Sequence, residues 1–565
     1  MVSVGTDWKA LASEKRDAVL AQIPDAWKIP GTISSADEVP DVTGPYIQQF
    51  LDAREIMVTE TDAVGIVEKT SSGEWTAVEV TKAFCHRAAL AHQLVNCLHE
   101  ICFDAAIENA QQLDTYFAEY KQPVGPLHGL PVSLKDQFHI KGIETTMGYV
   151  GWIGTFQGNK DDPRRFTFES ELVKELRNLG AVLYCKTSVP TTLMTTETVN
   201  NILGYTWNPR NRHLSSGGSS GGEAALIALK GSPGGFGTDI GGSVRIPASY
   251  NGLWGLRPCG RLPYEGAATS IDGQNTVLSV VGPLSSSLGG LKLLFKAILQ
   301  QQPWLHDPMV IEIPWREPIV EETQRLITKA KSTPGVLAFG LLRHDGIVHP
   351  TPPVARALGS VVSALRQAGH KIIEWDPPSH KLGAKILMDA LTADGGADVR
   401  YHLGLSGEPQ PEQIGVNRQQ EEQKNVLEVA AINIAKREYK KAYLEYWNST
   451  KDLTDTGRPV DAVLCPVTAH SPITPNKSRS MEYTLVSSLL DYTAVVIPVT
   501  HVKKEVDLPH TSMEYLSEWD KLAQTEYDPK VHFNGPVGIQ LLGRCLEEEK
   551  MLTLAEYIKT EVLDR

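Results

Sequence analysis

Two glycine-rich loops that carry serine are the part of the sequence best suited to chemistry. Residues 217–222 contain Ser219, residues 241–243 end on Ser243, and the two serines lie 24 positions apart. Glycine loses more backbone entropy on folding than any other residue, so dense glycine indicates a geometry that a Cβ would block. Backbone N–H groups that approach a ligand or a developing anion are one such geometry. A pair of plain turns is the alternative interpretation.

Lys135 is the second chemical signal, because it ends a short apolar segment. Residues 130–134 are bounded by proline and are expected to form a strand that delivers this lysine at its end. Serine is a weak nucleophile until a base removes its proton. Lysine can be that base only when it is neutral, which requires burial or a nearby cation to lower its pKa from about 10.4. A lysine at an apolar strand end meets the burial condition.

Helices and strands that alternate along the chain must position these residues. Thr76 begins a helix expected to reach about Leu94, and another helix covers about residues 103–116. Further helices are expected over residues 171–179 and from Thr351 to Gly369, and one short helix over residues 224–229. The remaining expected strands cover residues 181–185, 336–342, 370–375, 461–466, 494–499 and 537–542. The pattern predicts an α/β fold with a large mixed twisted sheet covered by helices on both faces.

The domain organisation expected from the pattern is simple. Residues 1–58 form an N-terminal helical arm, and residues 59–565 form a single domain. A charged stretch at about residues 376–450 is expected to be a helix-rich insertion or cap within that domain.

Motif order and flanking residues together resemble the amidase signature family. The resemblance rests on Lys135 after GLPVSL, Ser219 in GGSSGGE and Ser243 in GTDIGGSVRIP, and it extends to GAVLYCKTSVP and to the terminal GPVGIQLLGR. The N-terminal arm looks like that of the fungal acetamidase and general amidase branch. The resemblance implies the amidase signature fold and a triad in which Ser243 is the nucleophile, Ser219 the bridging serine after a cis peptide bond, and Lys135 the base.

The resemblance also assigns roles to the neighbours of Ser243. The N–H groups of Ile240, Gly241, Gly242 and Ser243 would form an oxyanion hole, with glycine allowing them to converge. Asp239 and Arg245 would pair to brace this loop. Leu193, Met194 and Thr195 match the segment that contributes to the acyl side of the substrate pocket in relatives. No histidine has metal-ligand spacing, and neither a metal nor a cofactor is expected.

The expected function is hydrolysis of carboxylic acid amides through an acyl-enzyme intermediate. Short aliphatic or aryl amides come first, carbamate or ester side activity second, and fatty acid amides third. A hydrophobic pocket discriminates single methylenes by only about 1–3 kcal/mol, which favours broad specificity. The alternative is the A-type subunit of an amidotransferase, which carries the same triad and acts on glutamine within a tRNA-dependent complex.

Composition bears on partners and location. The net charge is −13, from 54 Lys and Arg against 67 Asp and Glu, without a basic block, so nucleic acid is not an expected partner. The seven cysteines are scattered with no C-x-x-C pair, which is typical of reduced thiols in a cytoplasmic protein. No apolar run is long enough to span a membrane. The expected partner is a small amide, and a homodimer is left open.

Overall fold

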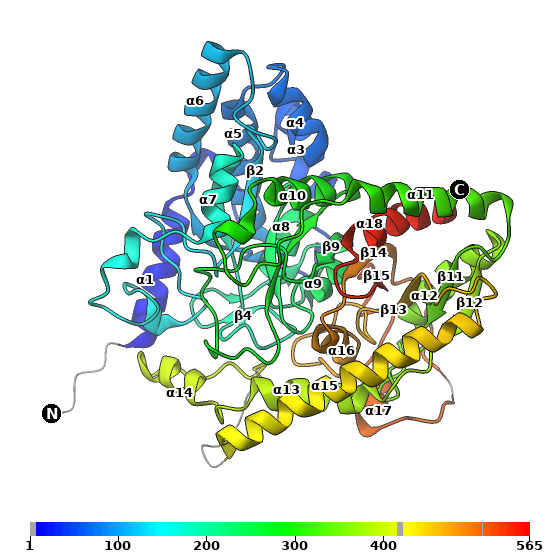
Figure 1. Cartoon of the computed structure of the whole chain (residues 1–565). Helices are drawn as coiled ribbons and strands as arrows, with labels where there is room; N and C mark the ends of the chain where they lie inside the picture. The colour runs from blue at the N-terminus through cyan, green and yellow to red at the C-terminus, as the bar shows by residue number, and fades with distance from the viewer. Residues whose placement is uncertain (1–6, 415–421, 511, 565) are drawn as a thin grey trace.

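The computed structural model describes residues 7–414, 422–510 and 512–564. Eleven strands form one sheet, in the order β1 (Leu98–Ile101), β3 (Val182–Thr187), β2 (Pro131–Lys135), β8 (Gly234–Asp239), β10 (Val280–Ser285), β9 (Trp254–Arg257), β14 (Ala494–His501), β15 (Pro536–Leu542), β13 (Ala462–Pro466), β11 (Ala338–Leu341) and β12 (Lys371–Glu374) (Figure 1). Strand β2 pairs in parallel with β3 and β8, whereas β10 is antiparallel to β8 and β9. The predicted mixed sheet is therefore confirmed.

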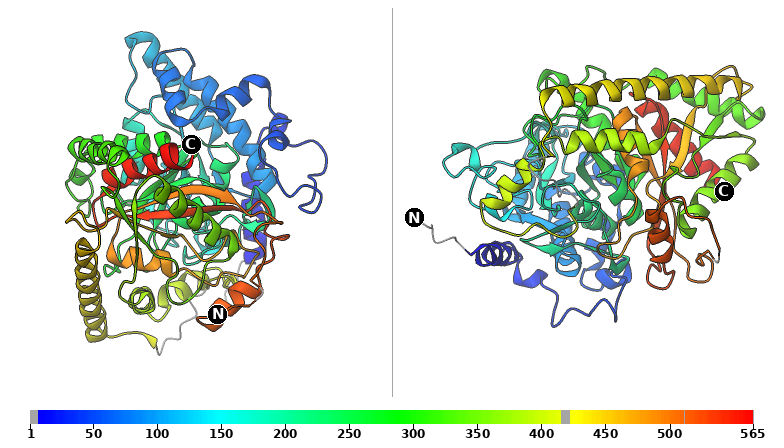
Figure 2. Two further views of the ribbon diagram at one scale, coloured as in Figure 1. Left: turned by 90° about the vertical axis from the view of Figure 1, so that its right-hand side faces the viewer. Right: turned by 90° about the horizontal axis from the view of Figure 1, so that it is seen from below.

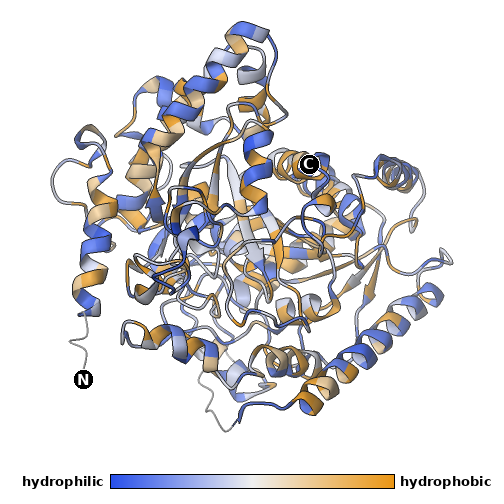
Figure 3. Ribbon diagram, turned by 60° about the vertical axis from the view of Figure 1, so that its left-hand side comes forward, coloured by the Kyte–Doolittle hydropathy of each residue, from blue (hydrophilic) through white to orange (hydrophobic). Residues whose placement is uncertain are grey.

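Helices cover both faces of the sheet, as strand β14 illustrates. Successive side chains of a strand point to opposite faces. Val495 and Ile497 belong to a core shared with helices α10 (Leu288–Gln300), α12 (Pro352–Gln367) and α18 (Glu548–Tyr557). Ala494 and Val496 face the other way, toward α9 (Arg245–Asn251), α13 (His380–Leu391) and α16 (Glu482–Leu490). Figure 3 shows apolar residues gathered in the interior between these layers.

Most of the expected elements are present with small shifts of their ends. Thr76 caps α5 (Ala77–Val95) by accepting from the Glu79 N–H, and α6 (Phe103–Tyr120) and α7 (Glu171–Asn178) follow. Strand β8 has no counterpart among the expected strands. Its sequence, GGFGTD, contains three glycines, which are depleted in strands, and only one β-branched residue, Thr238, so tertiary packing decides it.

The arm and the insertion both contain helices. The arm contains α1 (Trp8–Ala21), α2 (Pro45–Gln48) and α3 (Ala53–Glu60), and Lys15 of α1 pairs with Glu100 at 2.6 Å and Glu144 at 2.9 Å. The insertion contains α13, α14 (Ala397–Gly404) and α15 (Val426–Ser449). Figures 1 and 2 show α15 along the outer edge of the molecule, next to α13. Residues 1–6 and 415–421 of these two regions lie outside the described residues.

No helix in the described part of the chain has the length and apolar character needed to cross a bilayer.

Candidate active site

Lys135 is fully buried at the end of β2, where the sequence predicts it. Its Nζ lies 2.7 Å from Ser219 Oγ and 2.8 Å from Thr238 Oγ1. Burial lowers the pKa of Lys135 to about 7, although the negative charges of Asp239 and Glu223 act in the opposite direction. A substantial fraction of this lysine is therefore neutral near pH 7, which is the state in which it can accept a proton.

The loop that carries Ser219 connects the small strand β7 (Asn211–Ser215) to helix α8 (Gly221–Ala228). The peptide bond between Gly218 and Ser219 is cis, as the family resemblance implies. A Cβ on Gly218 would lie 2.7 Å from the backbone oxygens of Thr195 and Glu197, so only glycine fits here. Ser219 itself is 1% exposed. The loop is thus packed directly against residues 195–197, and its serine points to Lys135.

Ser243 lies in the turn between β8 and α9, and its side chain borders a cavity. Gly242 just before it has a φ of +129°, and a Cβ there would lie 2.5 Å from Thr484 Oγ1. The two serine loops are joined by a hydrogen bond from the Ser220 N–H to the Ser243 carbonyl oxygen, at 3.1 Å. Within the described structure, the hydroxyls of Ser219 and Ser243 are not hydrogen bonded to each other. The fold therefore brings the three expected triad residues to one place, with Lys135 and Ser219 in direct contact.

Asp239 and Arg245 form the expected ion pair, and both are fully buried. The guanidinium of Arg245 donates to both carboxylate oxygens of Asp239 at 2.9 Å. Burial alone would raise the pKa of Asp239, but the charge and hydrogen bonds of Arg245, helped by Arg257, lower it to about 2. Asp239 is therefore an anion throughout the physiological range and holds the turn around Ser243.

The same ion pair anchors the turn to helix α16. Arg245 also donates to Ser488 Oγ at 2.8 Å and to the Thr484 carbonyl oxygen at 3.1 Å. The Thr484 hydroxyl in turn donates to the Gly241 carbonyl oxygen at 2.6 Å. Nothing near the glycine loops in the sequence points to α16, because it lies more than 230 residues away along the chain.

The four N–H groups expected to form the oxyanion hole are not equivalent. Gly242 N–H donates to Asp239 Oδ1 at 2.7 Å and is therefore already engaged. The N–H groups of Ile240, Gly241 and Ser243 have no acceptor among the described residues. These three groups lie in the turn that borders the cavity and remain available for a ligand oxygen.

The cavity beside Ser243 has a volume of about 220 Å³ and a mostly apolar lining. Leu193, Met194 and Thr195, the residues expected to bind substrate, are among those that line it. The lining also includes Met388 and Leu391 of α13, Leu485 of α16, and Met481 just before α16. The insertion, whose role the sequence leaves undefined, thus supplies part of this lining.

Two further polar residues surround Lys135 and are absent from the expected site. Thr238 accepts a hydrogen bond from Lys135 and donates to Gln137 Oε1 at 2.5 Å. Glu223 accepts from Thr187 Oγ1 at 2.8 Å and from the Ser133 hydroxyl, and burial raises its pKa to about 7. Glu223 lies in the first turn of α8, where a negative charge is favoured by the helix dipole, and its carboxyl group also ties α8 to β2 and β3. In the sequence, the position of Thr238 only five residues before Ser243 is the one feature that could have placed Thr238 in the site.

Comparisons with known proteins show which family the chain belongs to. The family model described as Amidase matches residues 79–552. An acetamidase from Emericella nidulans is 44% identical over 553 residues, covering 98% of this chain and 97% of that protein. An acetamidase from Aspergillus oryzae is 42% identical over 555 residues, covering 98% of each.

Solved structures extend the comparison to the fold. A fatty acid amide hydrolase superposes with a TM-score of 0.87 at 32% identity, covering 99% of this chain and 96% of that chain. A peptide amidase from Stenotrophomonas maltophilia shares the fold, with a TM-score of 0.63 at 20% identity, covering 89% of this chain and 97% of that one. The chain therefore belongs to the amidase family, and it is an enzyme that hydrolyses amides.

Proposed function

We propose that Ser243 attacks the amide carbonyl, that Ser219 relays protons, and that Lys135 is the base. The observation that carries this proposal is the 2.7 Å contact between Lys135 Nζ and Ser219 Oγ in a fully buried setting. A lysine whose pKa is about 7 is matched to proton transfer near neutral pH. Rotation of the Ser243 side chain toward Ser219 completes the relay.

The reaction proceeds in two halves through an acyl-enzyme. In the first, a bond forms between Ser243 Oγ and the carbonyl carbon, and the Ser243 proton passes to Ser219, whose own proton passes to Lys135. When the C–N bond breaks, the Lys135 ammonium returns a proton through Ser219 to the leaving nitrogen, because an unprotonated amide nitrogen leaves poorly. In the second half, water attacks the Ser243 ester and the same relay operates in reverse.

The oxyanion of the tetrahedral intermediate would be held by the N–H groups of Ile240, Gly241 and Ser243. All three belong to one turn, which the buried pair of Asp239 and Arg245 keeps in place. Loss of a single oxyanion donor typically costs about 2.7–4 kcal/mol of transition-state stabilisation. The Asp239–Arg245 ion pair therefore affects catalysis by holding these N–H donors in place, without contacting the substrate.

Short aliphatic or aryl amides are the substrates that this cavity supports best. Its volume of about 220 Å³ lies below the roughly 300–1,000 Å³ of pockets that hold drug-sized ligands. The two similar fungal proteins named as acetamidases support the same preference.

A cytoplasmic location also belongs to this proposal, and it is supported by the seven unpaired cysteines, six of which are buried.

Initial rates across an acyl-length series test the substrate class. We expect kcat/KM to be highest for amides of short acids and for benzamide-like compounds, and to fall for a long-chain fatty amide. Met388→Ala, which widens the wall formed by α13, should raise the ratio of long-chain to short-chain kcat/KM by up to about tenfold. Glutamine and an ethyl carbamate complete the panel. A preference of the unaltered enzyme for the fatty amide would refute the short-chain assignment, and a preference for glutamine would favour the amidotransferase alternative.

A further inference from the structure

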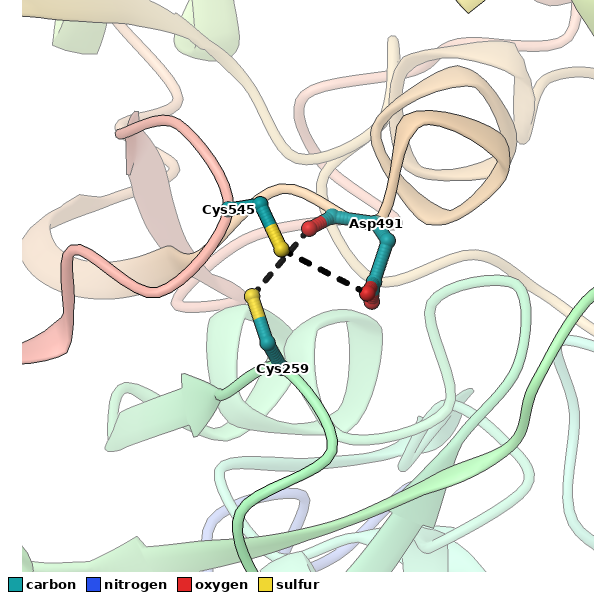
Figure 4. A group of neighbouring side chains, drawn as sticks. All are labelled: Cys259, Asp491 and Cys545. Carbon is teal, nitrogen blue, oxygen red and sulfur yellow. Dashed lines mark hydrogen bonds between the residues drawn. The ribbon is translucent and has the colours of Figure 1, made fainter. Parts of the chain in front are cut away.

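Three potential metal ligands meet at a place that the catalytic proposal does not use. Cys259 follows β9, Asp491 ends α16, and Cys545 follows β15. Their ligand atoms, two thiol sulfurs and a carboxylate oxygen, all lie within 4.8 Å of one another. Figure 4 shows the two thiols beside Asp491, with a hydrogen bond from Cys545 to the carboxylate oxygen Oδ2 and one from Cys259 to the main-chain carbonyl oxygen of Asp491.

The spacing of these atoms suits a tetrahedral metal ion. With Zn–S and Zn–O bonds of about 2.3 and 2.0 Å, a sulfur and an oxygen ligand of one zinc ion lie about 3.5 Å apart. Cys545 Sγ and Asp491 Oδ2 lie 3.6 Å apart. Thiolate ligands favour zinc and other thiophilic cations over magnesium or calcium.

The surrounding groups support ligation. The Arg257 guanidinium donates to Asp491 Oδ1 at 3.0 Å, which orients the carboxylate and leaves Oδ2 facing the cysteines. The Leu546 N–H donates to Cys259 Sγ at 2.9 Å, the kind of second contact that orients a metal ligand and favours the thiolate. Two thiolates, one carboxylate, a divalent cation and Arg257 together carry no net charge.

We propose that Cys259, Cys545 and Asp491 bind one zinc ion or a similar thiophilic divalent cation, with a water molecule in the fourth position. Binding replaces the two thiol protons, which leave to solvent, and it involves no oxidation or reduction. Cys545 is exposed and provides the entry path, whereas Cys259 is buried. The site would join the ends of three core elements.

The sequence could not indicate this site, because Cys259 and Asp491 are 232 positions apart and Asp491 and Cys545 are 54 positions apart. Recognisable zinc motifs place cysteines two to four residues apart. The site is also linked to the nucleophile turn, because Arg257 Nε lies 4.0 Å from Asp239 Oδ1.

Cobalt(II) titration of the metal-free, reduced full-length protein tests the proposal, since Co²⁺ bound to thiolates absorbs in the near ultraviolet. We expect a thiolate-to-cobalt band that saturates at one equivalent and disappears when Zn²⁺ is added. Cys545→Ser and Asp491→Asn should each weaken binding at least tenfold. Asn tolerates the left-handed backbone of Asp491, whose φ is +58°, so that variant keeps the turn.

Cys102→Ser is the matched control, because Cys102 is a buried thiol elsewhere in the fold and should leave cobalt binding unchanged. The melting temperature of each variant without metal verifies that it folds. Absence of the band in the unaltered protein, or its full retention in folded Cys545→Ser, would overturn the proposal. The proposal would also be overturned if the reduced protein binds no cobalt and mild peroxide instead joins Cys259 to Cys545 in a disulfide.

Discussion

The side-chain nitrogen of Lys135 lies 2.7 Å from the hydroxyl of Ser219, although 84 residues separate them in the chain. Strand β2 ends at the lysine, and the closely packed loop before α8 carries the serine, so the packing of this loop beside β2 sets the distance. Both side chains are removed from solvent. A buried base already in contact with a hydroxyl needs little reorganisation before it accepts a proton.

Ser243→Ala should lower kcat for amide hydrolysis by at least about 10³-fold, because no other group can form the acyl-enzyme. Initial rates on a short amide measure the loss, and the thermal unfolding profile should stay close to that of the unaltered enzyme. Ser219→Ala should also lower kcat for amide hydrolysis strongly, because it interrupts the proton relay to Lys135. Ser220→Ala is the matched control within the same loop, since its buried Oγ has no hydrogen-bond partner among the described residues. Retention of a tenth of the activity in Ser243→Ala would remove that serine from the nucleophile role.

Lys135→Ala should reduce hydrolysis of an amide more than that of the matched ester. The amine leaving group needs a proton from Lys135, whereas an alkoxide leaving group depends less on protonation. We expect the loss in kcat/KM for the amide to exceed that for the ester by at least tenfold. Equal losses on the two substrates would mean that Lys135 only supports the structure.

The pH dependence of kcat/KM should show an acid limb with an apparent pKa near 7. Protonated Lys135 cannot accept a proton, so activity rises as pH increases through the pKa of about 7. Glu223→Gln should move the limb modestly to lower pH, because the ionised fraction of Glu223, whose own pKa is about 7, raises the pKa of Lys135. The measurement is kcat/KM against pH for the unaltered enzyme and for Glu223→Gln on the same substrate. A limb that stays in place or moves to higher pH in Glu223→Gln would argue against Lys135 as the titrating group.

Arg245→Met should destabilise the enzyme by about 3–5 kcal/mol, because it leaves the Asp239 carboxylate buried without its main partner. Denaturant unfolding measures this loss, and kcat should fall with it as the turn around Ser243 loosens. Adding Asp239→Asn to Arg245→Met should recover part of the stability, since the uncompensated charge is gone. The exposed pair of Arg325 and Glu321 offers a control, because Arg325→Met should change the unfolding free energy little. A stability loss no greater than that of this control would contradict the bracing role.

The sequence anticipates the elements with strong local signals. Apolar runs such as β13, β14 and β15, the capped helix α5, and helix α12 with proline in its first turn lie close to their expected bounds. Strand β8 was not anticipated, because its glycines carry no strand propensity, and only close packing in the fold explains them: Gly235 lies against Glu223 and Ser133, and Gly237 against Ser220. Gly242 was expected to donate to the oxyanion, but its N–H is used by Asp239, a contact that only the folded turn reveals.

The sequence by itself determined which residues could carry the chemistry. Serines in glycine loops and a lysine after an apolar strand are local patterns, and their meaning does not depend on distant segments. Only the tertiary structure decided that Thr238 shares Lys135 with Ser219, that α16 anchors Arg245, that α13 lines the cavity, and that Cys259 and Cys545 meet at Asp491. The physical reason is that these contacts join segments brought together by the strand order of the sheet, which no local pattern encodes.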